Sequence, residues 1–444
     1  MNSTDSNNKY PKTLIIGNPF NNKSGGGITM SNLFRGWPKD RLALATNANI
    51  NIEAEPSICE NYFQLGFNGK LHPFPFNIVL SKVYCGPVKL KAVHNSTSSA
   101  SGPTPGRFKK IYNVLMNFLD FIGLYNFFYT IKIDDGFKKW VEEFSPDIIY
   151  SQLGSLGSIR FISDLSIITG KPVALHIMDD WPEMVYKRGL FHNYRKKLFI
   201  AEFKDLINRS AVLMSIGDAM SEEYKKRYNR DFTPFHNPIE INNWLPSSRN
   251  EWLRKDKFTI LYAGRIGLGM KSSVLDIARV VNHLLPDHQD LFFEIQTPDF
   301  YELEGSGIFN ENVTWVKPID YNKLPGKFAE VDLLLLPLDF DPEGIKFLKY
   351  SFQTKISEYM ISGTPVLVYA PEETSTAKYA AKDEWAYVVT ERSDLILENA
   401  ILDLYSDTDL RKRLGERAKQ LAETREDSKI VKEKFRDCLG GILQ

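Results

Sequence analysis

Short apolar runs alternate with helix-like segments through the first half of the chain. The run TLIIGNPF, after Lys12, predicts a strand that ends in glycine, and the polar turn NNKSGGG and a helix over ITMSNLFRGW follow it. Later apolar runs predict strands at 147–153, 172–178 and 211–217, with helix-like segments such as EFKDLINRS between them. This alternation is typical of a parallel sheet that helices cover on both faces.

The same alternation starts again after a connecting stretch at 236–257, which has two prolines and no sustained period. Strands are predicted at FTILYAG, LFFEIQT, VDLLLLPL and TPVLVYA, helices at SSVLDIARVVNHLL and TKISEYMISG, and a long charged helix from about 408 to the end. Runs such as LLLL are apolar on both faces, as in strands buried inside a parallel sheet. We therefore expect an α/β protein with domains at 1–240 and 241–420, and a C-terminal helix at 421–444 that packs back towards the first domain.

Composition narrows the class of protein. The 444 residues exceed what one hydrophobic core normally holds, and 43% hydrophobic with 25% charged residues is ordinary for a globular protein. Lysine plus arginine equals aspartate plus glutamate at 55 each, so the overall charge gives no support for a nucleic-acid partner. The charge is uneven, because the 59 residues at 61–119 contain lysines and arginines but no carboxylate side chain.

Cysteine usage and the first residues bear on the compartment. Cys59, Cys85 and Cys438 are odd in number and lack CxxC spacing, so we expect neither a disulfide framework nor a zinc site. The first residues are polar and carry no apolar signal core. A cytoplasmic protein is the expectation.

One apolar segment, at 111–131, is nearly long enough to cross a bilayer. Asn113, Asn117 and Asp120 recur in it at helical spacing, which favours an amphipathic helix over a spanning one. Two interpretations stay open: a helix buried in the core, or a helix that touches lipid, helped by the basic RFKK just before it.

Ligands of open parallel sheets bind beyond the carboxyl ends of the strands, so chemistry is sought there. After the first strand, Gly25, Gly26 and Gly27 allow a backbone loop to approach a ligand before a helix begins, or they make a plain tight turn. The spacing is not GxGxxG and no acidic ribose partner follows, so a nicotinamide cofactor is not expected.

The motif HIMDDWPE puts a histidine, two carboxylates and an indole after another predicted strand. His176, Asp179 and Asp180 suit hydrogen bonds to hydroxyls or orientation of an attacking alcohol, and Trp181 can stack on a sugar ring. The alternative is that an aspartate caps the next helix while Trp181 packs in the core.

The motif YAGRIG puts Gly264 and Arg265 directly after a strand, and Lys271 follows at a predicted helix start. Two cations beside a helix N-terminus favour a diphosphate, because they neutralise charge that the backbone amides orient. An exposed arginine without a ligand is the alternative.

The segment SFQTKISEYMISGTPV predicts a helix that runs into a buried strand. Thr354 and Lys355 suit phosphate at the start of that helix, and Glu358, one turn in, suits two vicinal ribose hydroxyls because a carboxylate is a double acceptor. A solvated lysine–glutamate pair is the alternative.

With these motifs the chain resembles GT-B glycosyltransferases, most closely glycosyltransferase family 4. YAGRIG, VDLLLLPL and SFQTKISEYMISGTPVLVY resemble the donor-binding half, and the glycine-rich loop, HIMDDWPE, SIGDAMSEEYKKRYN and FHNPI resemble the first domain, over about 12–435. The resemblance implies two Rossmann-like doubly wound domains with a cleft between them, and retaining transfer of a sugar from a nucleotide diphosphate sugar to an acceptor hydroxyl. No cofactor and no metal are implied.

The resemblance also assigns residues. Arg265 and Lys271 match the cationic pair that stabilises the leaving diphosphate, which makes them catalytic candidates beside His176 and Asp180. Glu358 matches the ribose-binding second glutamate of the E-x7-E motif.

The first glutamate of that motif falls at Tyr350, which is a departure. Either the tyrosine hydroxyl serves there, or the acids of DFDPEG reach the sugar, or activity is lost. A catalytically silent GT-B protein that binds sugars or partners, and a nucleotide-sugar epimerase, are therefore kept as alternatives.

The expected partners follow from this interpretation. They are a nucleotide sugar and a carbohydrate or lipid-linked acceptor, used in polysaccharide or glycolipid synthesis. The acid-free region 61–119 is expected to face an anionic membrane surface or a lipid-diphosphate acceptor, on the inner side of the membrane.

Overall fold

A computed structural model gives the fold. It describes residues 10–21, 25–48, 50, 54–55, 57–65, 85–89, 114–115, 117–123, 131, 133–253, 256–267 and 269–443. Most of the acid-free region at 61–119 lies outside these residues. The chain forms two compact units, one of Met1–Pro234 with Lys434–Gln444 and one of Phe235–Glu433.

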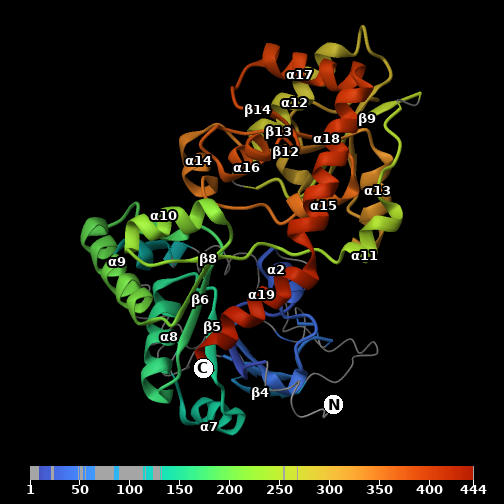
Figure 1. Cartoon of the computed structure of the whole chain (residues 1–444). Coiled ribbons are helices and arrows are strands. Elements are labelled where there is room, and N and C mark those ends of the chain that lie inside the picture. Colours follow the sequence, from blue (N-terminus) through green and yellow to red (C-terminus); the bar gives the residue numbers. More distant parts are fainter. Residues whose placement is uncertain are drawn as a thin grey trace, which may run out of the picture. The chain divides into compact units, whose positions relative to one another are not determined.

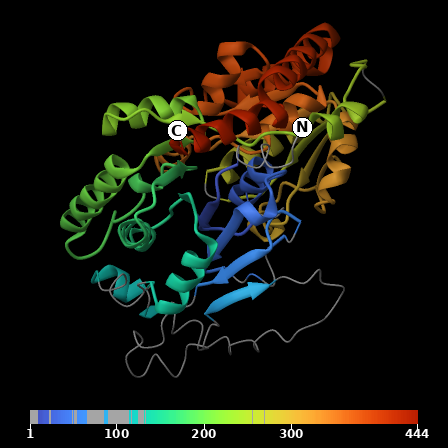
Figure 2. The ribbon, with the colours of Figure 1, turned by 60° about the horizontal axis from the view of Figure 1, so that its bottom comes forward.

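Unit 1 is built on one sheet whose described strands run in the order β4-β3-β2-β1-β5-β6-β7-β8 (Figure 1). All neighbours are parallel except β3 and β4, and β4 is one of the two edge strands of the described sheet (Figure 2). The strands are β1 (Thr13–Ile16), β2 (Leu42–Thr46), β3 (Asn61–Gln64), β4 (Gly86–Lys89), β5 (Ile148–Ser151), β6 (Val173–Ile177), β7 (Val212–Ser215) and β8 (Thr233–Pro234).

The helices of unit 1 connect these strands, and the last helix of the chain belongs to this unit from Lys434 on. They are α2 (Gly25–Phe34), η1 (Lys39–Arg41), α7 (Asp135–Phe144), α8 (Leu156–Thr169), η3 (Trp181–Glu183), α9 (His192–Arg209), α10 (Asp218–Tyr228), α19 (Ser428–Gly440) and η8 (Gly441–Leu443). Phe435 of α19 packs edge-on against Phe34 and Tyr150, with ring centroids 5.1 and 6.0 Å apart. The end of the chain is thus part of the core of unit 1.

Unit 2 has a wholly parallel sheet in the order β11-β10-β9-β12-β13-β14. Counted along the chain this order is third, second, first, fourth, fifth, sixth, which is that of a Rossmann fold. The strands are β9 (Phe258–Ala263), β10 (Leu291–Gln296), β11 (Val313–Val316), β12 (Leu333–Pro337), β13 (Val366–Tyr369) and β14 (Tyr387–Val389).

Helices and short turns of helix complete unit 2. They are α11 (Ile241–Trp244), η4 (Leu245–Ser247), α12 (Lys271–Leu284), η5 (Phe300–Glu302), η6 (Tyr321–Lys323), α13 (Leu324–Glu330), α14 (Pro342–Leu348), α15 (Ile356–Ser362), α16 (Ser375–Asp383), α17 (Asp394–Ser406), α18 (Thr408–Leu421) and η7 (Ala422–Glu426).

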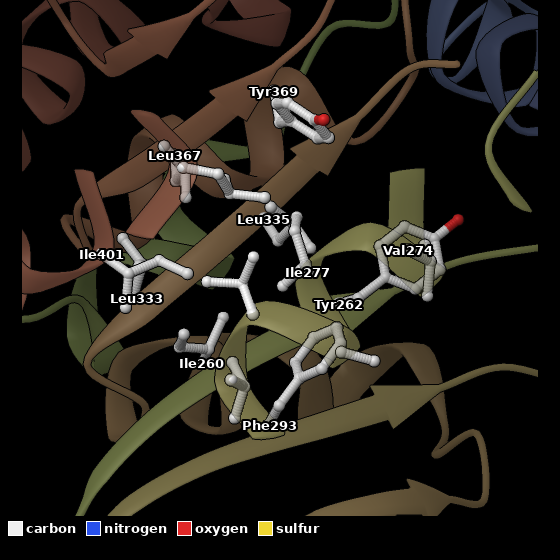
Figure 3. Close-up of a cluster of buried hydrophobic side chains, with 14 of the residues drawn as sticks. Ile260, Tyr262, Val274, Ile277, Phe293, Leu333, Leu335, Leu367, Tyr369 and Ile401 are labelled. Carbon is white, nitrogen blue, oxygen red and sulfur yellow. The ribbon is translucent and has the colours of Figure 1, made fainter. Parts of the chain in front are cut away.

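The strands of unit 2 bury both faces. Leu333 and Leu335 of β12 join Ile277 of α12 and Ile401 of α17 in one cluster, as Figure 3 shows. Leu334 and Leu336 point the other way, into a cluster with side chains of α13, α15, α16 and α18. This alternation with period two explains why the LLLL run is apolar throughout.

The predicted elements are confirmed in their type, with three differences. The helix expected at 111–131 is interrupted, because its described helical part ends at Phe121 and a turn follows in which Gly123 has a φ of 83°. Helix α2 begins at Gly25, so the three glycines form its first turn and are not part of a loop before it. The predicted long C-terminal helix is broken, because five residues of π-helix (η7) end α18 and Asp427 then takes a non-helical backbone before α19.

Candidate functional site

The reversal of strand order in unit 2 creates the candidate site. Strands β9 and β12 lie side by side, but the chain leaves them towards opposite edges of the sheet. The loops after the two strands therefore diverge and leave room for a ligand at the carboxyl end. Gly264 and Arg265 follow β9 directly, and Asp339 follows β12.

Lys355 reaches the end of β9 from the residue before α15. Its Nζ donates a hydrogen bond to the carbonyl oxygen of Ala263 at 3.1 Å and lies 4.2 Å from the centre of the Tyr262 ring. A Cβ on Gly264 would come within 2.6 Å of this Nζ, so the glycine leaves space for the amine. Burial lowers the pKa of Lys355 to about 7, although the nearby Glu358 opposes the shift.

Glu358 lies one turn further along α15 and is buried. Its Oε1 accepts a hydrogen bond from the hydroxyl of Tyr321 at 2.9 Å. Burial raises the pKa of Glu358 to about 7, and both the Tyr321 hydroxyl and Lys355 oppose the shift. An ammonium, a carboxylate and a phenol hydroxyl are thus gathered at one end of the sheet. Tyr321 was missed because nothing in its sequence context points to α15.

A buried network positions α15. The carboxylate of Glu426 accepts hydrogen bonds from Ser357 of α15 at 3.0 Å and from Tyr379 of α16 at 3.1 Å, and His236 Nδ1 lies 2.8 Å from it. Burial alone would raise the pKa of Glu426, but the charge and hydrogen bond of His236 and the two hydroxyls hold it below its usual value. The π-helical turn η7 thus provides the anchor of the helix that carries Glu358.

The two cations expected after β9 differ. Arg265 is exposed, and among the residues that the structure describes no hydrogen bond or ion pair holds its guanidinium. Lys271, the first residue of α12, lies 3.1 Å from the Glu302 carboxylate. Arg265 is therefore available to an anion, whereas Lys271 has an exposed intramolecular partner.

The N-terminus of α12 already holds an anion of the protein. The buried Asp339 accepts a hydrogen bond from the amide of Ser273 at 2.8 Å, and the Ser273 hydroxyl donates to the carbonyl of Leu338 at 2.9 Å. The expectation that a diphosphate sits on the free amides of this helix has to be corrected at Ser273, because Asp339 takes that amide.

The other residues of the donor motif lie between α14 and α15. Asp341 caps α14 through the amides of Glu343 and Gly344, so of the DFDPEG acids only Glu343 is exposed without a capping role. Tyr350 is half-buried in the bend before α15, with Lys349 Nζ 5.5 Å from its ring centre. Thr354 uses its carbonyl to accept a hydrogen bond from Asn237 at 3.0 Å.

In unit 1 the HIMDDWPE residues are mostly internal. His176 lies within β6, wholly buried, and its Nδ1 is 2.8 Å from the Tyr150 hydroxyl. Asp180 is buried and accepts two hydrogen bonds from Arg227 at 2.9 and 3.0 Å and one from Tyr224 at 2.9 Å. A substrate cannot reach the His176 ring in this structure, and Asp180 links the loop after β6 to α10.

The neighbouring residues of that motif divide between surface and core. Asp179 is half-exposed. Trp181 packs against Phe199 and Phe203 of α9, with centroids 5.4 and 5.8 Å apart. For Trp181 the structure supports the core interpretation over stacking on a sugar.

Unit 1 has its own pocket at the point where its strand order reverses. It measures about 240 Å³ and lies at the ends of β1, β2 and β5. Its described lining includes the uncharged polar side chains Asn18, Thr46, Asn47, Ser151, Gln152, Ser155 and Ser158.

Helix α2 begins beside this pocket. A Cβ on Gly26 would lie 3.4 Å from Gln152 Oε1, and one on Gly27 would clash with the Asn21 side chain. Gly25 is exposed. The three glycines therefore bring the start of the helix close to neutral polar groups.

Two further observations concern metals and membranes. No group of three or more histidine, cysteine or acidic side chains in the described part of the chain is arranged to hold a metal ion. Within the same residues, every helix is too short or too polar to cross a bilayer.

Comparison with known proteins places the fold. No protein-family model matches the chain, and neither does any curated protein sequence. At 13% identity it superposes on HepE from Anabaena with a TM-score of 0.60, over 97% of this chain and 99% of that one, in a structure solved with UDP and glucose. Sucrose-phosphate synthase from Thermosynechococcus elongatus gives 13% identity and a TM-score of 0.60 over 95% and 96% of the two chains.

WaaG, a glycosyltransferase of lipopolysaccharide biosynthesis, gives 14% identity and a TM-score of 0.52 over 96% of this chain and 98% of that one. At such identities the likeness speaks for the fold alone, and the resemblance to family 4 stays a prediction. The chain has the GT-B fold, with two Rossmann-like units built on parallel sheets.

Proposed function

We propose that the protein is a glycosyltransferase that moves a sugar from a nucleotide diphosphate sugar to a hydroxyl of a carbohydrate or lipid-linked acceptor. The observation that carries the proposal is the pair formed by the half-buried Lys355 and the buried Glu358 at the carboxyl end of the second sheet. Burying two ionisable groups beside a ligand-binding edge is costly to a fold and is typical of functional sites. HepE, solved with UDP-glucose, and WaaG, a glycosyltransferase, share the fold and support it.

The roles follow from the chemistry of each group. In the transfer, the bond between the anomeric carbon and the diphosphate oxygen breaks and a bond to the acceptor oxygen forms, while the acceptor proton leaves with the diphosphate. Negative charge grows on the diphosphate as the bond breaks, so Arg265 and Lys355 stabilise the transition state more than the bound donor. Glu358, when ionised, accepts hydrogen bonds from both ribose hydroxyls.

Retention of configuration, independence of metal ions and a place in polysaccharide or glycolipid synthesis are the finer parts of the proposal. They rest on the resemblance of the motifs. Transfer in the presence of a chelator, followed by determination of the anomeric configuration of the product, tests the first two.

Tyr350 favours one second candidate, a protein that binds nucleotide sugars without transferring them. A tyrosine hydroxyl is a weaker acceptor than a carboxylate and carries no charge at neutral pH. Stabilisation by a nucleotide sugar without transfer or hydrolysis would support this candidate.

The test is a screen of nucleotide sugars by thermal shift and by release of the nucleotide diphosphate, on wild type and on Glu358→Gln. We expect one nucleotide to stabilise the wild type, and Glu358→Gln to weaken its binding by about 1.5 kcal/mol or more, the scale of a hydrogen bond to a charged group. Glu416→Gln, an exposed acid on α18 outside the candidate site, is the matched control. Absence of stabilisation by every nucleotide sugar and nucleotide diphosphate would refute the proposal.

A further inference from the structure

Helix α9 turns apolar side chains outward over its first turns. Tyr194 and Leu198 lie four residues apart on α9 and are 69% and 41% exposed, and Leu190 and Phe191, just before the helix, are 48% and 76% exposed. The opposite face, with Phe199 and the residues one and two turns on, is buried. Large apolar side chains that recur along one exposed face mark an interaction surface more than chance exposure.

A second exposed stripe adjoins the first. Val114, Phe118 and Phe121 lie at spacings of four and three residues and are 69%, 55% and 51% exposed, whereas Leu119 between them is buried. The described part of the helix expected at 111–131 therefore exposes apolar side chains beside the polar Asn117 and Asp120.

A backbone hydrogen bond and an ion pair join the two stripes into one surface. The amide of Leu190 donates to the carbonyl oxygen of Phe121 at 2.7 Å, and Arg195 of α9 pairs with the Asp120 carboxylate at 3.0 Å. We call this the apolar surface of unit 1. It consists of Val114, Phe118, Phe121, Leu190, Phe191, Tyr194 and Leu198.

The charges around the apolar surface are mostly positive, and its exposed acid Asp120 is paired with Arg195. Between Glu183 and Glu202 the chain has no acidic residue, and the lysines and arginines there include Lys187, Arg188 and Lys197, all exposed. Cations beside exposed aromatic side chains match an anionic bilayer, because the rings enter the interface between headgroups and acyl chains while the cations meet lipid headgroups.

We propose that the apolar surface of unit 1 docks on an anionic lipid bilayer, with Phe118, Phe121, Phe191 and Tyr194 inserted at the interface and Lys187, Arg188 and Lys197 among the headgroups. This goes beyond sugar transfer, and it locates the contact on α9 and its neighbour, outside most of the acid-free region 61–119. The two elements are held together by hydrogen bonds, so they can enter the interface as one rigid surface.

The test is co-sedimentation with vesicles of phosphatidylcholine alone and of phosphatidylcholine mixed with phosphatidylglycerol. We expect binding to the mixed vesicles only, and a loss of at least about tenfold in the partition coefficient for the double variant Phe191→Ser/Tyr194→Ser. Ile167→Ser/Ile168→Ser on α8, with side chains 68% and 51% exposed, is the matched control and should bind as wild type does. Melting temperatures of all variants check that folding is intact.

The charge arm uses Lys187→Gln/Lys197→Gln, with Lys139→Gln/Lys226→Gln as the control that removes the same charge elsewhere on unit 1. The first variant should bind about 10- to 30-fold more weakly at low salt, and the control as wild type does. Equal binding to neutral vesicles, or unchanged binding of both surface variants, would overturn the proposal. Concentration-dependent self-association without lipid that Phe191→Ser/Tyr194→Ser abolishes would also overturn it, in favour of a second copy of this chain.

Discussion

The two sheets share an architecture but differ in what they present at the point where strand order reverses. Both follow the Rossmann order around their first strand, β1 in one unit and β9 in the other. At the end of β9 the described side chains include two cations and a buried carboxylate, Arg265, Lys355 and Glu358. At the end of β1 the described pocket is lined by neutral amides and hydroxyls.

In unit 1 the charged group at a strand end serves the fold. The Asp180 carboxylate accepts three hydrogen bonds, two from Arg227 and one from Tyr224. The strand order that the two sheets share fixes where a ligand binds, whereas the charge of the side chains at that place decides which ligand is bound. We infer that unit 2 takes the anionic donor and that the unit 1 pocket takes neutral hydroxyl groups of the acceptor.

The largest expected effect is on stability, and it tests whether the carboxylate of Asp180 is structural or catalytic. Asp180→Asn removes a buried charge from its bidentate partner Arg227, and we expect the free energy of unfolding to fall by about 3 kcal/mol or more, as measured by urea denaturation. Asp205→Asn, which breaks an exposed pair with Arg209, should cost less than about 1 kcal/mol. Unchanged stability of Asp180→Asn with lost transfer would instead make Asp180 a catalytic residue.

Lys355→Met tests whether the buried amine serves the fold or the ligand. We expect the affinity for a nucleotide diphosphate to fall by about 1.5–3 kcal/mol in calorimetry, because a charged hydrogen bond is lost. Without ligand, the melting temperature should rise by about 2 °C or more, since the fold no longer holds a desolvated amine. A lower melting temperature would show that the bond to Ala263 and the contact with Tyr262 are an anchor of the fold.

The sequence predicted the alternation of strands and helices because apolar runs and their spacing are local signals. It also placed Lys355 and Glu358 together, since three residues apart on a helix share a face. The structure adds partners that lie far along the chain. Asp180 and Arg227 are 47 residues apart, and Tyr321 and Glu358 are 37 apart. No local pattern encodes such pairs.

Burial was the other quantity that local pattern could not supply. His176 lies near the end of β6 as expected, but its ring is wholly buried against the Tyr150 hydroxyl. Asp339 was offered as a sugar ligand, yet it caps α12. In both cases the polar side chain makes a hydrogen bond to another buried group of the protein. Such a bond depends on residues that are distant in the sequence, so local spacing does not predict it.

The pH dependence of donor binding sharpens the assignment of Lys355. Its pKa is lowered to about 7 in the free protein, so the amine is neutral above pH 7 and must take up a proton to meet a diphosphate. We expect affinity to fall by up to about tenfold per unit as pH rises above 7, and to be insensitive to Lys355 below that value. The pH dependence of affinity in Lys355→Met reports the titration of the ligand and of the rest of the site. The difference between this pH dependence and that of the wild type gives the contribution of the Lys355 amine.

The lowered pKa of Lys355 also determines whether its contribution to the free energy of unfolding rises or falls with pH. Between pH 7 and the ordinary range of a lysine near 10.4, the unfolded chain binds a proton that the folded one does not, so this residue makes stability rise with pH there. The slope should be smaller in Lys355→Met. Equal slopes in both proteins would mean that the amine stays charged in the fold.

The smallest expected effect concerns the neutral pocket. Gln152 is buried at the end of β5, with its amide oxygen beside the start of α2. We expect Gln152→Ala to raise the KM for the acceptor by about fivefold, the scale of one neutral hydrogen bond, without changing the affinity for the nucleotide. Asn208→Ala, an exposed amide on α9 outside the pocket, is the control.

The described lining of this pocket carries no charge, so the KM for the acceptor should not change with salt concentration. The affinity for the donor, which meets charged groups, should weaken as salt concentration rises. If Gln152→Ala weakens the nucleotide and leaves the acceptor alone, the division of labour between the two sheets is reversed. Arg265, the exposed cation after β9, would then bind an anion other than the diphosphate of the donor.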